Sequence, residues 1–278
     1  MPKHFMLLLA AAVFLGLLLG SGVGLVSSAS AFEPTFLKAA PRMAYGSSST
    51  ALNWAGYAVA VQSGEVDAAY GSWIVPTLSC SSKGTTYAAF WVGIDGYNDS
   101  TVEQTGVLGE CEHGSAVYSA WYEFYPASPV YANSSDVVKP GDTMYGRVVY
   151  NSASNCFTTT LTDKTEGWTY TSPCTAVSGA QRSDAEWITE RPAVAGSLTT
   201  LANFGTAYYG YDYTGMSGTN TVVINGVTRT VAQSNYIAIT MVSYNGKVLA
   251  SPSALTTDGT SFTVSYVSSS PTHGNGHK

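Results

Sequence analysis

From Leu52 onward, short runs rich in Val, Ile, Thr, Tyr and Trp alternate with positions occupied by Gly, Asn, Asp and Ser. Such runs predict β-strands separated by turns, because β-branched and aromatic side chains suit a pleated, half-buried surface. No segment has the spacing of an amphipathic helix, and no repeat of fixed length is present. The predicted strands are Ala55–Val61, Ala68–Val75, Thr86–Ile94, Val117–Phe124, Thr143–Tyr150, Phe157–Asp163, Trp168–Ser172, Ala185–Glu190, Ala202–Tyr209, Thr219–Ile224, Val227–Val231, Tyr236–Ser243, Lys247–Ala250 and Ser261–Val267.

The turns between these runs indicate hairpins. Asn225-Gly226 and Asn245-Gly246 each predict a two-residue turn, since both positions of that turn need a positive φ. Many short strands at this spacing predict a sandwich or a barrel. We expect an all-β fold, an antiparallel two-sheet β-sandwich of the jelly-roll or concanavalin-like type, with one concave face suited to an active site.

The first residues have the pattern of a secretory signal peptide. A basic start at Lys3 precedes an apolar run from Phe5 to Leu19, and small residues follow, ending in Ala29-Ser30-Ala31. We therefore expect a cleaved signal peptide over residues 1–31 and a secreted, extracellular protein with no stable membrane association after cleavage. An uncleaved leader that holds an inert domain at the cell surface is the alternative.

The rest of the chain is expected to divide into three parts. Residues 32–50 contain two prolines and a Gly-Ser run without a clear period, which is typical of a linker or a short pro-segment. Residues 51–270 are expected to form one β-sandwich domain, long enough to bury a substantial core. Residues 271–278 are expected to be a flexible tail, and the exported protein is expected to be a monomer.

The chain has four cysteines, Cys80, Cys111, Cys156 and Cys174, and an even number in an exported chain predicts two disulfides. Three pairings are possible. Cys156 and Cys174 flank a predicted hairpin, which favours them as a pair and leaves Cys80 with Cys111.

Charged residues make up 11% of the chain, against about 25% in an average soluble domain. A surface with few basic groups builds up little repulsion in strong acid, so the composition is compatible with work at low pH. The net charge of −6 argues against a nucleic-acid partner.

Histidine and metal chemistry find little support in the sequence. Between the leader and the tail, His113 is the only histidine, and its polar neighbours predict a surface turn. No H-E-x-x-H motif occurs, and no His/Cys/Asp cluster has the spacing of metal ligands. We therefore expect no metal and no cofactor, which leaves the chemistry to carboxylates and amides.

The carboxylates fall into two groups by their surroundings. Those in turns, predicted to be solvated, are Glu110, Glu112, Asp136, Asp163, Glu166 and Asp258. Those within or beside aromatic β-segments are Asp95, Glu103, Glu123, Asp142, Glu186 and Glu190. Any two of the second group could form a glycosidase pair. The alternative is one glutamate with a neutral amide, such as that of Gln104, which could donate a hydrogen bond to a developing oxyanion.

The segment Ser183–Pro192 is expected to place two glutamates on one face of a strand and a tryptophan on the other. On an extended strand, Glu186 and Glu190 share one face, and Trp187 points the other way. Partial desolvation beside a large aromatic raises the pKa of a carboxyl and suits it to proton transfer. A solvated edge strand with two surface glutamates is the alternative.

Six motifs occur in one order along the chain. They are Asn53-Trp54-Ala55-Gly56-Tyr57, Trp73-Ile74-Val75-Pro76-Thr77, Trp91-Val92-Gly93-Ile94-Asp95-Gly96, Gln104-Thr105-Gly106, Trp121-Tyr122-Glu123-Phe124-Tyr125-Pro126 and Ala185-Glu186-Trp187-Ile188. Together they resemble the glutamic peptidases of the eqolisin family, which are exported acid proteases, over about residues 53–267. The resemblance implies two long antiparallel sheets and a glutamine–glutamate pair that hydrolyses protein or peptide substrates.

Carried over by motif, Gln104 corresponds to the catalytic glutamine of the family and Glu186 to its catalytic glutamate. Four further residues fall on positions that line or support the cleft: Trp91, Asp95, Trp121 and Glu123. The implied function is that of a secreted acid endopeptidase in which Glu186 acts as general base and then acid, and Gln104 as oxyanion donor. Glu103 departs from the pattern, since an apolar residue is usual there, and it is expected to place an extra carboxylate beside the pair.

Two further expectations concern function. Pepstatin should not inhibit, because the chain lacks the pair of Asp-Thr-Gly loops that make an aspartic dyad. The alternative functions are those of a β-sandwich glycoside hydrolase and of a carbohydrate-binding lectin, since a curved face with aromatics and carboxylates also describes them.

Overall fold

The computed structural model describes residues 34–36, 41–45 and 48–267. The chain divides into two units, Met1–Ala31 and Phe32–Lys278. The predicted signal peptide and the predicted tail lie outside the described residues, and both stay predictions. Within the part of the chain that the structure describes, no helix has the length and apolar character needed to cross a membrane.

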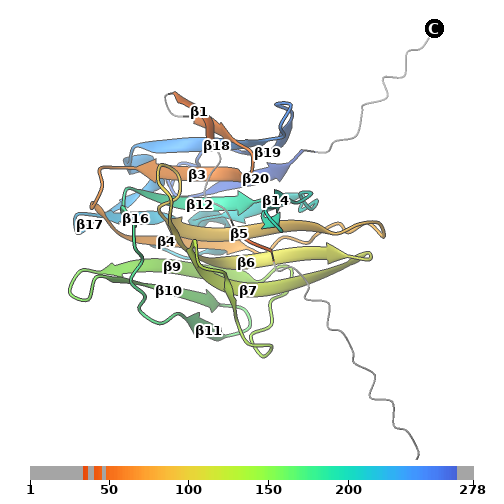
Figure 1. Cartoon of the computed structure of the whole chain (residues 1–278), viewed down its shortest axis with the longest axis horizontal. Helices are drawn as coiled ribbons and strands as arrows, with labels where there is room; N and C mark the ends of the chain where they lie inside the picture. The colour runs from red at the N-terminus through yellow and green to blue at the C-terminus, as the bar shows by residue number, and fades with distance from the viewer. Residues whose placement is uncertain (1–33, 37–40, 46–47, 268–278) are drawn as a thin grey trace, which may run out of the picture. The chain divides into compact units, whose positions relative to one another are not determined.

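The strands of the second unit form two layers (Figure 1). In the first layer, neighbouring strands follow the order β8, β7, β6, β5, β12, β3, β18, β2 and β1. Their bounds are β8 Val130–Tyr131, β7 Ser115–Tyr125, β6 Val102–Glu112, β5 Thr86–Ile94, β12 Asp184–Glu190, β3 Trp54–Ala60, β18 Tyr236–Val242, β2 Ser48–Ala51 and β1 Pro41–Tyr45. Only the pair β18–β2 is parallel in this layer.

The second layer follows the order β11, β10, β9 and β4, and β4 pairs further with β15 and β16. The strands β20 and β19 then connect β15 to β18, so the two layers are joined along one side. The bounds are β11 Trp168–Thr171, β10 Cys156–Asp163, β9 Thr143–Asn151, β4 Val66–Ile74, β15 Thr206–Tyr209, β16 Thr221–Ile224, β17 Val227–Thr230, β19 Val248–Pro252 and β20 Phe262–Tyr266. The expected all-β, antiparallel architecture is confirmed.

The main hydrophobic core lies between the layers and takes every second side chain of their strands. It includes Trp73 of β4, Phe90 of β5 and Trp187 of β12, all without exposed surface. The Trp187 indole donates a hydrogen bond to the backbone oxygen of Tyr70 at 2.7 Å, which satisfies its polar atom inside the core. Trp187 therefore points away from Glu186, as the alternation along β12 predicts.

A second hydrophobic cluster covers the opposite face of the first layer. Its members include Trp54, Trp91, Trp121 and Ile188, again without exposed surface. Both faces of the central strands are thus covered, and β12 is buried along its whole length. The reading of this segment as a solvated edge strand is wrong.

Both favoured cysteine pairings are confirmed, since Cys80 is bonded to Cys111 and Cys156 to Cys174. The hairpin at Asn225-Gly226 is also confirmed, with both residues at positive φ. The hairpin between β18 and β19 has a wider loop than predicted, because it closes through a bond from Ser243 N to Lys247 O.

The sequence interpretation missed several elements. The largest omission is β6, in which Gly106 and Gly109 interrupt the apolar pattern. The others are β1, β2, β8, β13 (Ala193–Val194), β14 (Ser197–Leu198), the short helix α1 (Tyr211–Thr214) and the 3-10 helix Val231–Gln233. The strand β2 also crosses the boundary placed between residues 50 and 51. Asp163 was expected in a solvated turn, but it ends β10 and is fully buried, which corrects that expectation.

Candidate active site

Four residues form one row across the first layer. Glu186 of β12 lies opposite Gly93 of β5, Gly93 lies opposite Gln104 of β6, and Gln104 lies opposite Glu123 of β7. Directly opposed residues of antiparallel strands project to the same face. Glu186 and Gln104 are therefore on one face, two strands apart, with a glycine between them.

Gly93 leaves open the space between the two longer side chains. A Cβ atom at this position would lie 2.8 Å from Cζ3 of Trp91 and 3.3 Å from Cβ of Gln104. The Cα atoms of residues two strands apart are separated by roughly 10 Å. The carboxyl of Glu186 and the amide of Gln104 can therefore approach one small molecule only by leaning over the strand that separates them, where Gly93 presents no side chain.

Gln104 is held in a fixed orientation by Glu123. Its Nε2 donates a hydrogen bond to Oε2 of Glu123 at 2.7 Å, and both side chains are buried. A primary amide has two N–H bonds, so one remains for another acceptor. Among the described residues, Oε1 of Gln104 has no hydrogen-bond partner. The amide therefore offers one donor and one acceptor to a bound molecule.

The carboxyl of Glu123 is under opposing influences. Burial raises its pKa well above the usual range, and repulsion from Glu190 raises it further. The hydrogen bond from Gln104 and the backbone N–H of Phe36 act in the opposite direction. The two donors offset only part of the rise, so Glu123 retains its proton to higher pH than an exposed glutamate.

Glu186 is fully buried, and in the described part of the chain no N–H or O–H group donates to either of its carboxyl oxygens. Burial raises its pKa well above the usual range, and the neighbouring Asp184 carboxyl raises it further, by charge and by direct contact. Asp184 lies two positions earlier on β12 and so on the same face. The pair is therefore expected to retain a proton to higher pH than an isolated carboxyl, with that proton on Glu186.

The sequence interpretation did not assign a role to Asp184 or Asp99. Oγ of Ser183 lies 2.7 Å from Oδ2 of Asp184 and 3.1 Å from Oδ2 of Asp99. One hydroxyl hydrogen cannot serve both acceptors, so the second contact needs a proton on a carboxyl. Asp184 could have been identified from the sequence, because it lies two positions before Glu186 and so on the same face of a strand.

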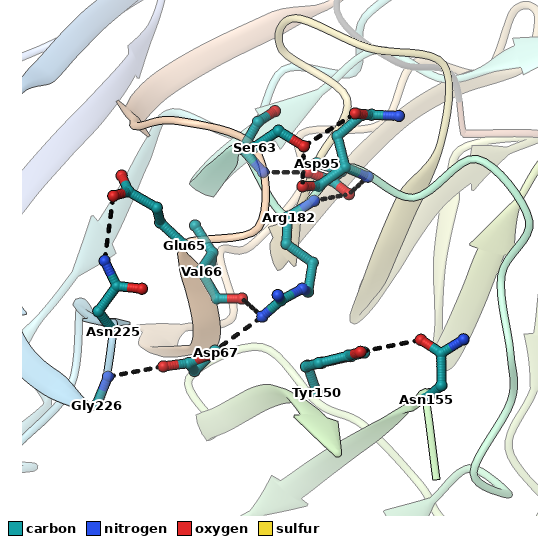
Figure 2. Close-up of polar contacts among 12 residues, drawn as sticks. Ser63, Glu65, Val66, Asp67, Asp95, Tyr150, Asn155, Arg182, Asn225 and Gly226 are labelled. Carbon is teal, nitrogen blue, oxygen red and sulfur yellow. Dashed lines mark hydrogen bonds and ion pairs between the residues drawn. The ribbon is translucent and has the colours of Figure 1, made fainter. Parts of the chain in front are cut away.

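Asp95 anchors the segment that leads into β12. Its carboxyl accepts hydrogen bonds from the backbone N–H groups of Gln181, Arg182 and Ser183 at 2.7–2.8 Å (Figure 2). Burial raises the pKa of Asp95, while the bonds from Ser183 and Arg182 oppose that rise. Asp95 thus fixes where β12 begins, and through it the position of Glu186.

The side chain of Arg182 fixes the same segment from the other side. Its guanidinium donates to the backbone oxygen of Val66 and to Oδ1 of Asp67, each at 3.1 Å (Figure 2). It also lies over the ring of Tyr150, 4.0 Å from the centroid. The start of β12 is therefore tied both to β5 and to the strands β4 and β9 of the second layer.

The two tryptophans expected at the cleft lie in the row next to that of Glu186, Gly93 and Gln104. Ile188, Trp91, Gly106 and Trp121 are opposed across β12, β5, β6 and β7. Nε1 of Trp91 donates to Oε2 of Glu190 at 2.9 Å, which fixes the ring beside Gly93. The ring of Trp121 is stacked against that of Phe36. The structure thus brings both indoles to the face that carries Gln104 and Glu186.

Glu103 does not face the pair. It lies opposite Ile94, whose side chain belongs to the core between the layers, so Glu103 projects to that side. Burial raises its pKa well above the usual range, and the charge of Asp95 adds to the rise. The expectation that Glu103 adds a carboxylate beside the pair is therefore wrong.

Three carboxylates, those of Asp95, Asp99 and Asp184, lie near enough to share a cation, with one oxygen of each within 4.8 Å of the others. Their oxygens already accept hydrogen bonds from backbone N–H groups and from Ser183. These bonds account for the cluster without a ligand, and we assign it no metal.

Comparison with known proteins places this geometry in context. The sequence pattern of the Peptidase A4 family matches residues 52–266. Aspergillopepsin-2 of Aspergillus niger is 30% identical over 236 residues, which are 77% of each chain. The crystal structure of aspergilloglutamic peptidase from Aspergillus niger is similar with a TM-score of 0.56 and 29% identity, over 66% of this chain and 99% of that one. Scytalido-glutamic peptidase with a transition state analog inhibitor has a TM-score of 0.64 at 22% identity, over 77% of this chain and 98% of the other.

Proposed function

The chain belongs to the Peptidase A4 family, the eqolisins, and is a glutamic-type peptidase, and we propose that it is a secreted acid endopeptidase in which Glu186 and Gln104 carry out the chemistry. The observation that supports this assignment most strongly is the row of Glu186, Gly93, Gln104 and Glu123 on one face of the sheet. It brings a buried acid and a buried amide, distant in sequence, to either side of a position without a side chain.

In the first step, ionised Glu186 takes a proton from a water molecule, and the water oxygen bonds to the carbonyl carbon of the scissile peptide. The carbonyl π electrons move to the oxygen, and the free N–H of Gln104 stabilises the resulting oxyanion. Oε1 of Gln104 can accept a hydrogen bond from the attacking water and so orient it. In the second step, the C–N bond breaks and Glu186 returns the proton to the leaving amine.

The surroundings of Glu186 suit both steps. Burial raises its pKa well above the ordinary value, which is about 4.3 for glutamate. A general base is most effective when its pKa lies near the working pH, and the same holds for the acid that it becomes. A glutamate with a raised pKa is therefore suited to act as a base in mildly acidic solution, where an unperturbed histidine would be largely protonated.

Glu123 and Asp95 support the pair without acting on substrate in this proposal. Glu123 accepts a hydrogen bond from one N–H of Gln104, so the second N–H of that amide points away from Glu123. Asp95 fixes the backbone at the start of β12. We call both positioning residues, and we assign the faces of Trp91 and Trp121 to contact with the peptide substrate.

The test uses purified chain and a denatured protein substrate at about pH 3 and about pH 7, on either side of the ordinary glutamate pKa. We expect cleavage in acid, no effect of pepstatin, loss of cleavage in Glu186→Gln and severe loss in Gln104→Ala. Glu112→Gln, at an exposed position of β6, is the matched control. Full activity of folded Glu186→Gln would refute the assignment, and release of reducing sugars from a glycan would support a glycoside hydrolase instead.

A further inference from the structure

A short described segment, Pro34–Phe36, lies against the face that carries the proposed catalytic pair. The ring of Phe36 stacks on Trp121 with centroids 3.8 Å apart and planes inclined by 10°. Neither residue has exposed surface. Trp121 precedes Glu123 by two positions on β7, so both project to this face. The stacked pair is therefore next to the carboxyl that holds Gln104.

The backbone of the same segment is bound as an extra strand. Thr35 N donates to Ala193 O at 2.6 Å, and Ala193 N donates to Thr35 O at 2.7 Å. These reciprocal bonds form an antiparallel bridge at a point just after the end of β12. Proteins hold extended peptides in this way, with backbone bonds for affinity and side-chain pockets for specificity.

The backbone of Phe36 also faces the site. Burial raises the pKa of Glu123, and the Phe36 N–H is one of the groups that oppose this rise. The backbone of Thr35 is thus bonded to Ala193 of β13, and the backbone N–H of Phe36 is directed at the Glu123 carboxyl. The Phe36 ring covers Trp121. An extended peptide substrate with an aromatic side chain at the corresponding position would make the same contacts.

This inference rests on the proposed function. We propose that the face of Trp121 is a substrate subsite that takes an aromatic side chain, and that Pro34–Phe36 occupies this subsite as a substrate would. Two consequences follow. The chain that retains Phe36 binds substrate in competition with its own segment, and the best substrates carry Phe, Tyr or Trp at the position that displaces Phe36.

The first test compares the full chain with Phe36→Ala and Phe36→Trp, with mass spectrometry confirming that residue 36 is still attached. A competing segment raises KM and leaves kcat unchanged. We expect Phe36→Ala to lower KM by about tenfold or more, as befits loss of a buried aromatic contact, with kcat within about twofold. Phe36→Trp should keep the high KM. An unchanged KM in folded Phe36→Ala would overturn the competition, as would a change confined to kcat.

The second test uses peptide pairs that differ by Phe or Ala at one position, scanned along the substrate. At one position, we expect Phe to raise kcat/KM by about tenfold or more. This preference should shrink below about threefold in Trp121→Leu and persist in Trp121→Phe, which keeps an aromatic face. Equal kcat/KM for all pairs would overturn the subsite, as would a preference that survives Trp121→Leu. Cleavage of denatured protein that depends on Glu186 tests the proposed function separately, so either proposal can fail alone.

Discussion

The substitution Gly93→Ala tests the geometry of the site with a single methyl group. The added Cβ would lie 2.8 Å from Cζ3 of Trp91 and 3.3 Å from Cβ of Gln104. The indole cannot simply swing aside, because it is fully buried and its Nε1 is bonded to Glu190 at 2.9 Å. The methyl group therefore enters the space over which Glu186 and Gln104 have to meet.

The expected magnitude follows from that displacement. A shift on the order of 1 Å in a catalytic group costs about 100-fold in rate, which corresponds to about 2.7 kcal/mol in activation free energy. Overpacking in a core costs about 1–3 kcal/mol of stability, and the lower entropy of the unfolded alanine chain returns up to about 1 kcal/mol. We expect kcat/KM to fall by at least about 100-fold while the protein stays folded.

The matched control is Gly109→Ala. Its added Cβ would also have its nearest neighbour at 2.8 Å, which is Cδ1 of Leu78. Gly109 lies opposite Ala88, whose side chain is in the core between the layers, so this methyl group is on the other face of β6. The assays are kcat/KM on a peptide at acidic pH and unfolding by denaturant. The reasoning is refuted if the two variants have equal stability and kcat/KM values within about threefold of each other, since a displaced pair costs far more.

Three further outcomes are expected. Glu123→Leu removes the acceptor of Gln104 and should lower kcat by about tenfold or more at little changed KM, whereas Glu123→Gln keeps an acceptor oxygen and should restore most of kcat. Asp184→Asn removes a charge that raises the pKa of Glu186, so the acidic limb of the kcat profile should move to lower pH. The free energy of unfolding should decrease from about pH 4 to about pH 6, because burial, with repulsion from a second carboxyl, raises the pKa of Asp99 to about 6.

The sign of the stability effect follows from proton binding. A carboxyl with a raised pKa is protonated in the folded chain at a pH at which the unfolded chain has already released its proton. The stability that the carboxyl contributes is therefore retained in acid and is lost as the pH rises through its pKa in the folded chain. Asp163, whose pKa burial also raises to about 6, contributes in the same window. Denaturant unfolding of Asp99→Asn and Asp163→Asn should show a flatter pH dependence, and an unchanged slope in both would contradict the explanation.

The acidic limb and the kcat effect have their own controls. The control for Asp184→Asn is Glu112→Gln, which removes a carboxylate that is exposed at the end of β6. The acidic limb of its kcat–pH profile gives the reference position. A limb that stays in place would show that the Asp184 charge does not act on Glu186. For Glu123, equal kcat in the Leu and Gln variants would show that the hydrogen bond to Gln104 at 2.7 Å does not position the amide.

The residue types and the alternation of side chains along the chain predicted many of the strands, because both depend on local side-chain chemistry. The segment Thr86–Ile94 was predicted with the bounds that the structure shows, and the opposite orientations of Glu186 and Trp187 were predicted correctly. The strand β6 was missed because Gly106 and Gly109 replace apolar side chains in its pattern. At Gly106 a Cβ would lie 2.3 Å from the backbone oxygen of Phe90, so close contact with β5 excludes a side chain there.

The site could be predicted only in part. The motifs proposed Gln104 and Glu186 as candidates. The strand pairing that puts them on one face passes through Gly93, and register between distant strands is not encoded in any one segment. Asp184 could have been found because it lies two positions before Glu186 on the same strand and so projects to the same face. Phe36 could not, since its segment has no period and its contact with Trp121 joins residues far apart in the chain.

The strand β12 is bonded on both sides, to β3 and to β5, over nearly its whole length. A peptidase cleaves a segment that is extended and no longer hydrogen-bonded to neighbouring strands. A central strand is released only when both of its neighbours separate from it, which approaches global unfolding. Resistance of this enzyme to digestion by its own copies is thus set by the stability of the entire domain. Amide deuteration along β12 should accordingly be among the slowest in the molecule.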